Sequence, residues 1–442
     1  MSKFVSHSSS ETYYKNQLDI ITKENKSIKD KSQILEKQNL ELQKSLYELG
    51  FNYRHLLNLM NKTSHNYSTN FQNDLDLSIF LNLEPKKEMS VESFRDGTNF
   101  KFIEEFEGHE GAVYAVRFSK CGKFLASCSF DHTIHILKGF NQKPFVLSKL
   151  HSEVISDIKW SYNSDFLLSG GYDHIVNIFD VGKSELAHSF FIEEPGLIQT
   201  VEFSSENENI IYVGSSNKSI YLFDARSSNN SKSSIISEIK ANSSVNTLAS
   251  LPTNNHLLLA GTSKGILEIF DLRKKKSCLE SIQNSSEPIS HISVSQNKMK
   301  DISYGEFFIG LNSYDNVIRV YESSKMKVIS TCVGHSNKNL PIKGSFCINC
   351  FMEKNQNLDK EKKEKVLFAT GSSDHKVYIF DIKKETEIQP LQVIEDYSGV
   401  VNCVDFHPKV PLLATGSSDF SIKLWGSTQL DFTDFNSFAD LR

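Results

Sequence analysis

The chain lacks the features that would place it in a membrane or outside the cell. No stretch of its 442 residues reaches the roughly 18 consecutive apolar residues of a transmembrane helix. The residues after Met1 are polar and contain no apolar core of a signal peptide. Seven cysteines, an odd number at irregular spacing, do not suit a disulfide framework. We therefore expect an intracellular protein, nuclear or cytoplasmic, without a membrane span.

An excess of one charge and the common catalytic motifs are also missing. The net charge of −5 gives no electrostatic reason to expect direct binding of nucleic acid. There is no phosphate-binding glycine loop, no His-Glu-x-x-His, no Gly-x-Ser-x-Gly and no paired zinc knuckle. Cys347 and Cys350 lie three apart in an expected strand, so they point to opposite faces and are poorly placed to share a metal. We expect no enzymatic activity, cofactor, metal or small-molecule substrate.

The first periodic pattern is a heptad repeat between residues 14 and 60, within an expected coiled-coil domain at 11–62. One core position of the heptad holds Tyr14, Ile21, Ile28, Leu35, Leu42, Leu49 and Leu56. Asn25 and Asn39 occupy the other core position, where each needs the equivalent Asn of a second, in-register helix. The pattern predicts a parallel homodimer through residues 14–60. The alternative is a single amphipathic helix packed on the protein's own core.

Residues 63–97 are rich in Asn, Ser and Asp and are expected to form a linker. Within them, Leu and Ile alternate with other residues from Leu75 to Leu83, the period of a half-buried strand. This segment could dock on the C-terminal domain or on a partner.

From residue 100 onward the sequence repeats short β-type runs separated by turns. Each run closes on a large apolar residue, at Leu137, Phe179, Phe223, Phe270, Tyr321, Phe380 and Trp425. Six residues earlier stands a turn residue, at Asp131, Asp173, Asn217, Lys264, Asp315, Asp374 and Asp419. A short Asp or Asn side chain bonds to its own backbone and closes a tight turn. The spacing predicts seven repeats.

Three of these repeats carry a recognisable signature. The segments that resemble WD repeats are GHEGAVYAVRFSKCGKFLASCSFDHTIHIL, LHSEVISDIKWSYNSDFLLSGGYDHIVNIFD and VVNCVDFHPKVPLLATGSSDFSIKLW, and the resemblance extends over residues 104–425. It implies an all-β, seven-bladed β-propeller at 98–426, followed by a tail at 427–442. It also assigns His109, His151 and His335 to structural hydrogen bonds. Trp survives only in blade seven, so the family's bond network is incomplete and blades three to five should depend mainly on apolar packing.

The last repeat lacks an outer strand of its own. Residues 100–106 alternate roughly between apolar and polar side chains just before the first repeat. We expect them to supply this strand and to close the ring, which leaves no open end.

The resemblance also implies a binding face around the central channel. Two positions per blade should reach it, the residue before the turn residue and the start of the first strand. The candidates are Tyr114, Phe130, Ser156, Tyr172, Tyr314, Lys343 and Asn402. Tyr114, Phe130 and Tyr172 are predicted to form one aromatic wall. The alternative is that each packs on its neighbouring loop.

Further similarities concern the kind of complex that the protein assembles. A coiled coil followed by a propeller resembles Groucho/Tup-type corepressors and the coiled-coil autophagy scaffold, whereas the repeat text is similar to the propeller subunit of histone-methyltransferase complexes. Two repeats end in Phe223-Asp224-Ala225-Arg226 and Phe270-Asp271-Leu272-Arg273. These repeat ends resemble those of cullin-RING ligase substrate receptors. All three imply a dimeric scaffold that binds proteins or peptides. The charged residues 274–276 and 352–365 are expected to be solvated loops.

Overall fold

The computed structural model describes Lys31 and residues 99–139, 143–193, 196–205, 207–226, 235–251, 256–273, 278–295, 307–348, 366–382 and 387–427. The expected coiled coil (11–62, apart from Lys31), the linker with residues 75–83, the loops at 274–276 and 352–365, Cys350 and the tail after Ser427 lie outside the described residues. The described part contains no helix that is long and apolar enough to cross a bilayer.

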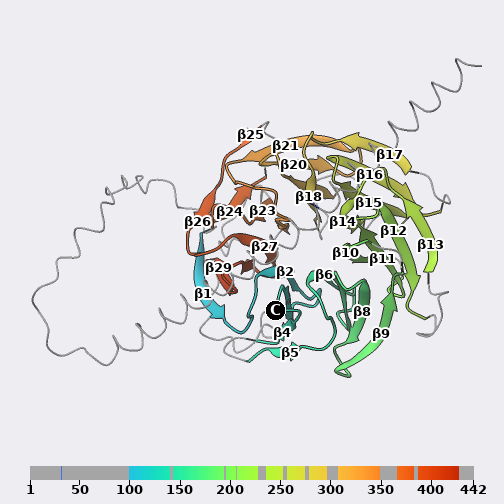
Figure 1. The fold of residues 1–442 in the computed structure, drawn as a ribbon. Helices are drawn as coiled ribbons and strands as arrows, with labels where there is room; N and C mark the ends of the chain where they lie inside the picture. Colours follow the sequence, from blue (N-terminus) through green and yellow to red (C-terminus); the bar gives the residue numbers. More distant parts are fainter. Residues whose placement is uncertain are drawn as a thin grey trace, which may run out of the picture. The chain divides into compact units, whose positions relative to one another are not determined.

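Seven sheets stand around a central axis like the blades of a closed ring (Figure 1). The described part of this domain is built of strands, and it confirms the predicted all-β, seven-bladed propeller.

The strands follow one another from the axis outward in each blade. Blade 1 contains β2 (Val113–Phe118), β3 (Leu125–Ser129), β4 (Ile134–Leu137) and β5 (Phe145–Leu147). Blade 2 contains β6 (Ile155–Trp160), β7 (Phe166–Gly171), β8 (Ile175–Asp180) and β9 (Glu185–Phe191). Blade 3 contains β10 (Ile198–Phe203), β11 (Ile210–Ser215), β12 (Ser219–Asp224) and β13 (Ile235–Lys240). Blade 4 contains β14 (Val245–Ser250), β15 (Leu257–Thr262), β16 (Ile266–Asp271) and β17 (Cys278–Gln283).

The remaining blades vary this plan. Blade 5 contains β18 (Ile289–Val294), β19 (Phe308–Ser313), β20 (Val317–Glu322) and β21 (Lys327–Val333), with β25 (Glu387–Ile388) added in parallel. Blade 6 contains β22 (Gly344–Ile348), β23 (Val366–Thr370), β24 (Val377–Asp381) and β26 (Gln392–Ile394). Blade 7 contains β27 (Val401–Phe406), β28 (Leu412–Ser417), β29 (Ile422–Ser427) and β1 (Phe100–Phe106).

The ring closes as the sequence predicts. β1 pairs antiparallel with β29, from Phe100 opposite Ser427 to Phe106 opposite Ile422. Phe106 packs with Val113 of blade 1 and Leu424 of blade 7 in one apolar cluster. The N-terminal strand therefore completes the last blade and joins it to the first.

A bulge interrupts the inner edge of six blades. The pairing between the first two strands skips one residue, and the skipped residues are Tyr114, Ser156, Gln199, Asn246, Ser290 and Asn402. In blade 6 the strand begins at Gly344, directly after Lys343, and no residue is skipped. A bulge redirects a side chain away from the regular pleat, so in six blades the same position of the repeat is oriented differently from its neighbours.

The tight turns also repeat. The residue after the turn residue has a positive φ in every blade, from 63° at His174 to 74° at Phe420. The Asp131 carboxylate accepts the backbone N–H of Thr133 at 2.8 Å, and Asp419 accepts that of Ser421 at 3.1 Å. Blade 4 has Lys264 instead of an acid, followed by Gly265. A Cβ on Gly265 would lie 2.3 Å from the Ser285 carbonyl oxygen, so the backbone there approaches too closely for any larger residue.

Two of the expected structural histidines join their blades through hydrogen bonds. His109 contacts Asp131 at 2.8 Å and Ser127 at 2.9 Å. His151 contacts Asp173 at 3.1 Å and Ser169 at 2.8 Å. In these blades the histidine therefore ties the loop before the first strand to the second strand and its turn.

His335 does not form the bond expected of it. It is buried, yet neither ring nitrogen has a hydrogen-bond partner among the described residues. Asp374 instead accepts the Tyr378 hydroxyl at 2.6 Å, and Asp315 pairs with Arg319 at 2.8 Å. Both neighbouring carboxylates thus bond to other side chains and not to His335.

Candidate functional site

A cavity of about 250 Å³ opens at the end of the ring where the first strands begin. Its wall contains the skipped residues of five blades together with Lys343 of the sixth. Among the residues that line it are Tyr114, Ser156, Tyr172, Gln199, Asn246, Ser290, Tyr314 and Lys343. The bulges therefore build the mouth of the central channel, because they turn one side chain per blade toward it.

Five of the seven predicted binding residues meet in this cavity: Tyr114, Ser156, Tyr172, Tyr314 and Lys343. The other two lie elsewhere. Phe130 is 37% exposed but does not line the cavity, and its ring lies 6.5 Å from that of His132. Asn402 is buried and donates hydrogen bonds to Val113 O and Ser418 Oγ, both at 3.0 Å.

The aromatic side of the mouth therefore differs from the predicted wall. It consists of Tyr114, Tyr172 and Tyr314, whereas Phe130 stands apart. Position in the repeat identified these residues, but it could not show that Tyr314 of blade 5 faces the same cavity as Tyr172 of blade 2. Asn402 is used to hold blade 7 against blade 1 and has no amide donor left for a ligand.

Sequence reasoning missed Gln199, Asn246 and Ser290. They occupy the skipped position in blades 3 to 5, where the Gly-His pair is missing and the start of the repeat is hard to recognise. Each of them is the second residue of its blade's first strand, so this position in the repeat would have identified them.

The three tyrosines keep their protons at neutral pH. Burial, followed by the neighbouring Tyr172, raises the pKa of Tyr114 to about 12. Burial also raises the pKa of Tyr314, and Tyr172 adds to the effect. None of the three hydroxyls bonds to another described residue, so each can donate to or accept from a ligand.

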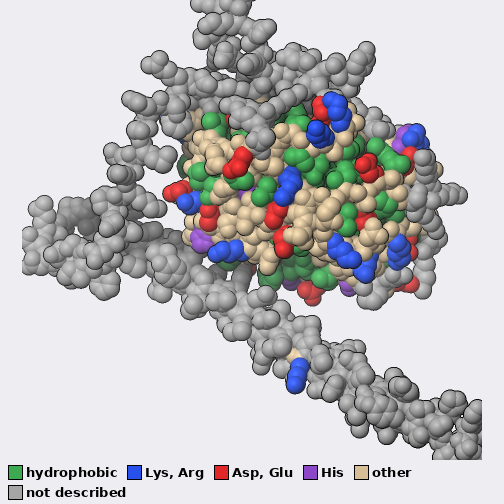
Figure 2. All heavy atoms as spheres, turned by 90° about the horizontal axis from the view of Figure 1, so that it is seen from above, with side chains coloured by type: hydrophobic (Ala, Val, Ile, Leu, Met, Phe, Trp, Pro, Cys, Tyr) green, Lys and Arg blue, Asp and Glu red, His purple; other side chains and the backbone are tan. Residues whose placement is uncertain are grey.

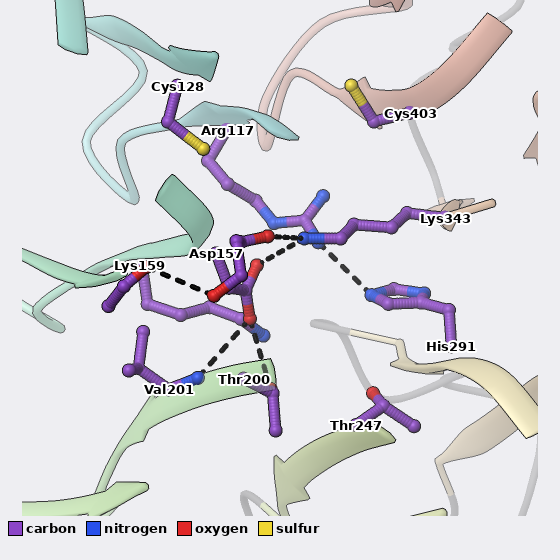
Figure 3. A network of polar contacts seen from close by, with 12 residues as sticks. Arg117, Cys128, Asp157, Lys159, Thr200, Val201, Thr247, His291, Lys343 and Cys403 are labelled. Carbon is purple, nitrogen blue, oxygen red and sulfur yellow. Dashed lines mark hydrogen bonds and ion pairs between the residues drawn. The ribbon is translucent and has the colours of Figure 1, made fainter. Parts of the chain in front are cut away.

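An ion pair across the channel forms the floor of the mouth (Figure 3). Lys343 Nζ of blade 6 donates to Asp157 Oδ1 of blade 2 at 2.6 Å and to Ser156 O at 3.1 Å. Asp157 Oδ2 also accepts from Thr200 Oγ1 at 3.0 Å. Burial alone would raise the pKa of Asp157, but the nearby cations, Lys343 first, hold it below its usual value. The floor is therefore polar, charge-balanced and fixed by several bonds.

A second contact crosses the channel beside the first (Figure 3). Arg117 Nη2 of blade 1 lies 3.1 Å from His291 Nε2 of blade 5, and both side chains are buried. A guanidinium can only donate, and so can the Gly344 backbone N–H, which lies 3.3 Å from Nδ1, so a neutral imidazole accepts from one of these two donors. Burial and the surrounding cations lower the pKa of His291 well below its usual range. The described residues contain no group of three or more His, Cys, Asp or Glu placed to hold a metal ion.

Arg226 and Arg273 lie at the other end of their blades. Each follows the end of a third strand that starts at the mouth side, and each pairs with the Asp two residues earlier. The shortest distances are 2.7 Å from Arg226 to Asp224 and 3.1 Å from Arg273 to Asp271. Both arginines remain more than half exposed, so this face is separate from the mouth.

Comparisons with known proteins agree with this geometry. Residues 100–137, 145–180 and 388–426 match the family "WD domain, G-beta repeat". Residues 188–357 match the family "Nucleolar protein 10-like, N-terminal domain". The first family thus matches blades 1, 2 and 7, which keep the clearest repeat signature.

Several curated proteins are similar over about three quarters of the chain. The WD repeat-containing protein WDS homolog of Arabidopsis thaliana is 27% identical over 75% of this chain and 58% of its own length. The serine-threonine kinase receptor-associated protein of Dictyostelium discoideum is 23% identical, with 75% and 85% covered. The U5 small nuclear ribonucleoprotein 40 kDa protein of the same organism is 25% identical, with 73% and 83% covered. The chain therefore spans just over half of the first relative and most of the other two.

Proposed function

Because this chain is a WD-repeat β-propeller protein, we propose that it acts without catalysis and binds a protein or peptide partner at the mouth of its channel. The observation that carries the proposal is the cavity bounded by Tyr114, Tyr172 and Tyr314 over a fixed polar floor. Aromatic side chains that are partly buried around a concave site are typical of binding hot spots. The size of the cavity suits one or two side chains of a partner rather than a large cofactor.

We further propose that the protein is a scaffold, nuclear or cytoplasmic, that dimerises through residues 14–60. Two relatives carry names that refer to a larger assembly or to a receptor, which supports a role in complex formation. A dimer has two mouths. Once one mouth has bound a partner that carries two binding sites, the second mouth meets the other site at a higher effective concentration. Sedimentation of the full chain measures this state directly, and a monomer at micromolar concentration would rule it out.

Arg226 and Arg273 favour one specific alternative, a substrate receptor of a ubiquitin ligase. They occupy equivalent positions in adjacent blades and lie away from the mouth, which would leave the mouth free for a substrate. Charge reversal of both arginines would then abolish ligase-adaptor binding and leave partner binding at the mouth intact.

The main proposal is tested with Tyr172→Ala combined with Tyr314→Ala in the full chain. We expect capture of the principal partner, identified by pull-down and mass spectrometry, to fall by about a thousandfold, since each of the two hot-spot truncations costs about 2 kcal/mol. The matched control is Tyr162→Ala, which removes a tyrosine that is 79% exposed in the loop between β6 and β7, at the opposite end of blade 2. Normal capture by a double variant whose melting temperature is unchanged would move the binding site away from the mouth.

A further inference from the structure

A second concave surface lies on the outer wall, between blade 6 and blade 7. This groove has a volume of about 470 Å³ and is lined by Phe100, Phe102, Gln392, Val393, Ile394, Glu395, Asp396 and Trp425. Phe102 is 50% exposed and Val393 is 39% exposed. On the face drawn in Figure 2, apolar side chains lie among charges of both signs. Other outer strands also expose large apolar side chains, such as Phe191 at 62% on β9, but here Phe102 and Val393 border a hollow.

The floor of the groove is already fixed. The Gln392 amide of blade 6 accepts the Phe100 N–H at 2.9 Å and donates to the Phe100 carbonyl at 2.8 Å. Trp425 donates from Nε1 to the Tyr397 hydroxyl at 2.7 Å and meets the Phe102 ring edge-on at 5.6 Å. Because these side chains are held in place, an occupant would pay little to order them.

The charges around the groove are balanced. Glu395 pairs with Lys376 at 2.5 Å, and Asp396 pairs with Lys423 at 3.0 Å. The groove therefore does not repel a segment that carries a few acidic residues between apolar ones.

The described chain ends beside this groove. Ser427, the last residue of β29, pairs with Phe100, which lines it. The sequence continues with apolar residues at every second or third position: Leu430, Phe432, Phe435, Phe438 and Leu441. A chain spans at most about 3.5 Å per residue, so Phe432 can lie up to about 17 Å from Ser427, within reach of the groove.

We propose that residues 428–442 bind back onto their own propeller in this groove, with Phe432 and Phe435 covering Phe102 and Val393. Covering these side chains removes apolar surface from water on both partners. The covalent link through Ser427 raises the local concentration of the segment to about the millimolar range, so even a weak contact is occupied. The occupant is thus a segment of this chain, and its function is to close an apolar surface that would otherwise attract other proteins.

The test measures how fast a thiol in the groove reacts. Val393→Cys is introduced into the full chain, and its alkylation by a maleimide is followed by peptide mass spectrometry, which separates it from the native cysteines. We expect slow labelling, and at least a tenfold acceleration when Phe432, Phe435 and Phe438 are all changed to Ser. The matched tail variant changes Thr433, Asn436 and Ala439 to Ser and should leave the slow rate unchanged.

Val146→Cys is the reference thiol, because Val146 is 45% exposed on β5 of blade 1. Its rate should be fast and independent of the tail. The proposal fails if the thiol at 393 reacts as fast as the one at 146 with the native tail, or if both tail variants protect it equally. Protection that disappears on dilution would also overturn it, since the occupant would then come from a second copy. None of these outcomes depends on whether the mouth binds a partner.

Discussion

The residue two positions before each closing residue makes a different contact from blade to blade. In blade 1 it is His135, whose ring stacks on His109 at 3.7 Å. In blade 6 it is Tyr378, which donates to Asp374, and in blade 7 it is Lys423, which bonds to Asp396 and lies 5.0 Å from the centre of the Tyr397 ring. Tyr378 and Lys423 each bond to a carboxylate, whereas His135 contacts its partner by ring stacking. The repeat can therefore diverge in sequence as long as that position supplies some partner.

His335 is buried, and neither of its ring nitrogens has a hydrogen-bond partner among the described residues. Its burial leads to a prediction about pH. Burial lowers its pKa from 6.5 to about 4, although Asp315 and Asp374 act in the opposite direction. Above pH 6.5 the ring is neutral in both the folded and the unfolded chain and adds no pH dependence to the stability. As the pH falls from 6.5 to about 4, only the unfolded chain gains the proton, and the free energy of unfolding drops by up to about 1.4 kcal/mol per pH unit.

We therefore expect His335→Leu to flatten the loss of stability between pH 6.5 and 4, measured as the melting temperature across that range. At pH 7 its stability should be equal or higher, because an apolar group replaces two nitrogens that have no partner among the described residues. His135 and His407, whose pKa values burial also lowers to about 4, should keep part of the acid sensitivity. An unchanged slope would show that His335 is not a source of it.

At the level of elements, the sequence predicts most of what the repeat itself encodes. The turn residues and closing residues located seven blades, and the alternation at 100–106 identified β1 as the closing strand. The bulge at the start of six first strands was not predicted, because a skipped residue is a property of the pairing between two strands. Gln199, Asn246 and Ser290 were missed because blades 3 to 5 lack the Gly-His pair that marks the start of a repeat. Phe130 was placed at the mouth by the same rule as Tyr172 and Tyr314, and position in the repeat does not show which way a side chain points.

β1 offers a direct test of closure. Phe106 is 7% exposed and packs against both the first and the last blade, so Phe106→Ala should lower the free energy of unfolding by about 3 kcal/mol or more. Phe191→Ala is the matched control on the outer strand β9, where the side chain is 62% exposed and its loss should cost less than about 1 kcal/mol. Denaturation in urea compares the two. Equal effects would mean that β1 contributes no more to stability than an ordinary outer strand does.

At the scale of the whole molecule, stability is shared between blades. The described apolar core divides into seven clusters, and each cluster combines side chains from two adjacent blades. Lys343 and Asp157 then join blades 6 and 2 across the channel, and Arg117 and His291 join blades 1 and 5. Their positions in the sequence differ by 186 and 174 residues, so no local pattern could have paired them.

The pair at the centre of the ring separates the cost of an unpaired buried charge from the value of the pair itself. Lys343→Met leaves the Asp157 carboxylate buried without its cation, and Asp157→Asn leaves the ammonium in the same position. Breaking such a pair costs about 3–5 kcal/mol, whereas replacing both charged groups with neutral ones is often nearly neutral. We therefore expect each single variant to melt well below the wild type and the double variant, Lys343→Met with Asp157→Asn, to recover most of the loss. If the losses in unfolding free energy are strictly additive, the two side chains stabilise the ring independently of each other. The rigidity of the floor of the mouth would then come from the backbone and not from the ion pair.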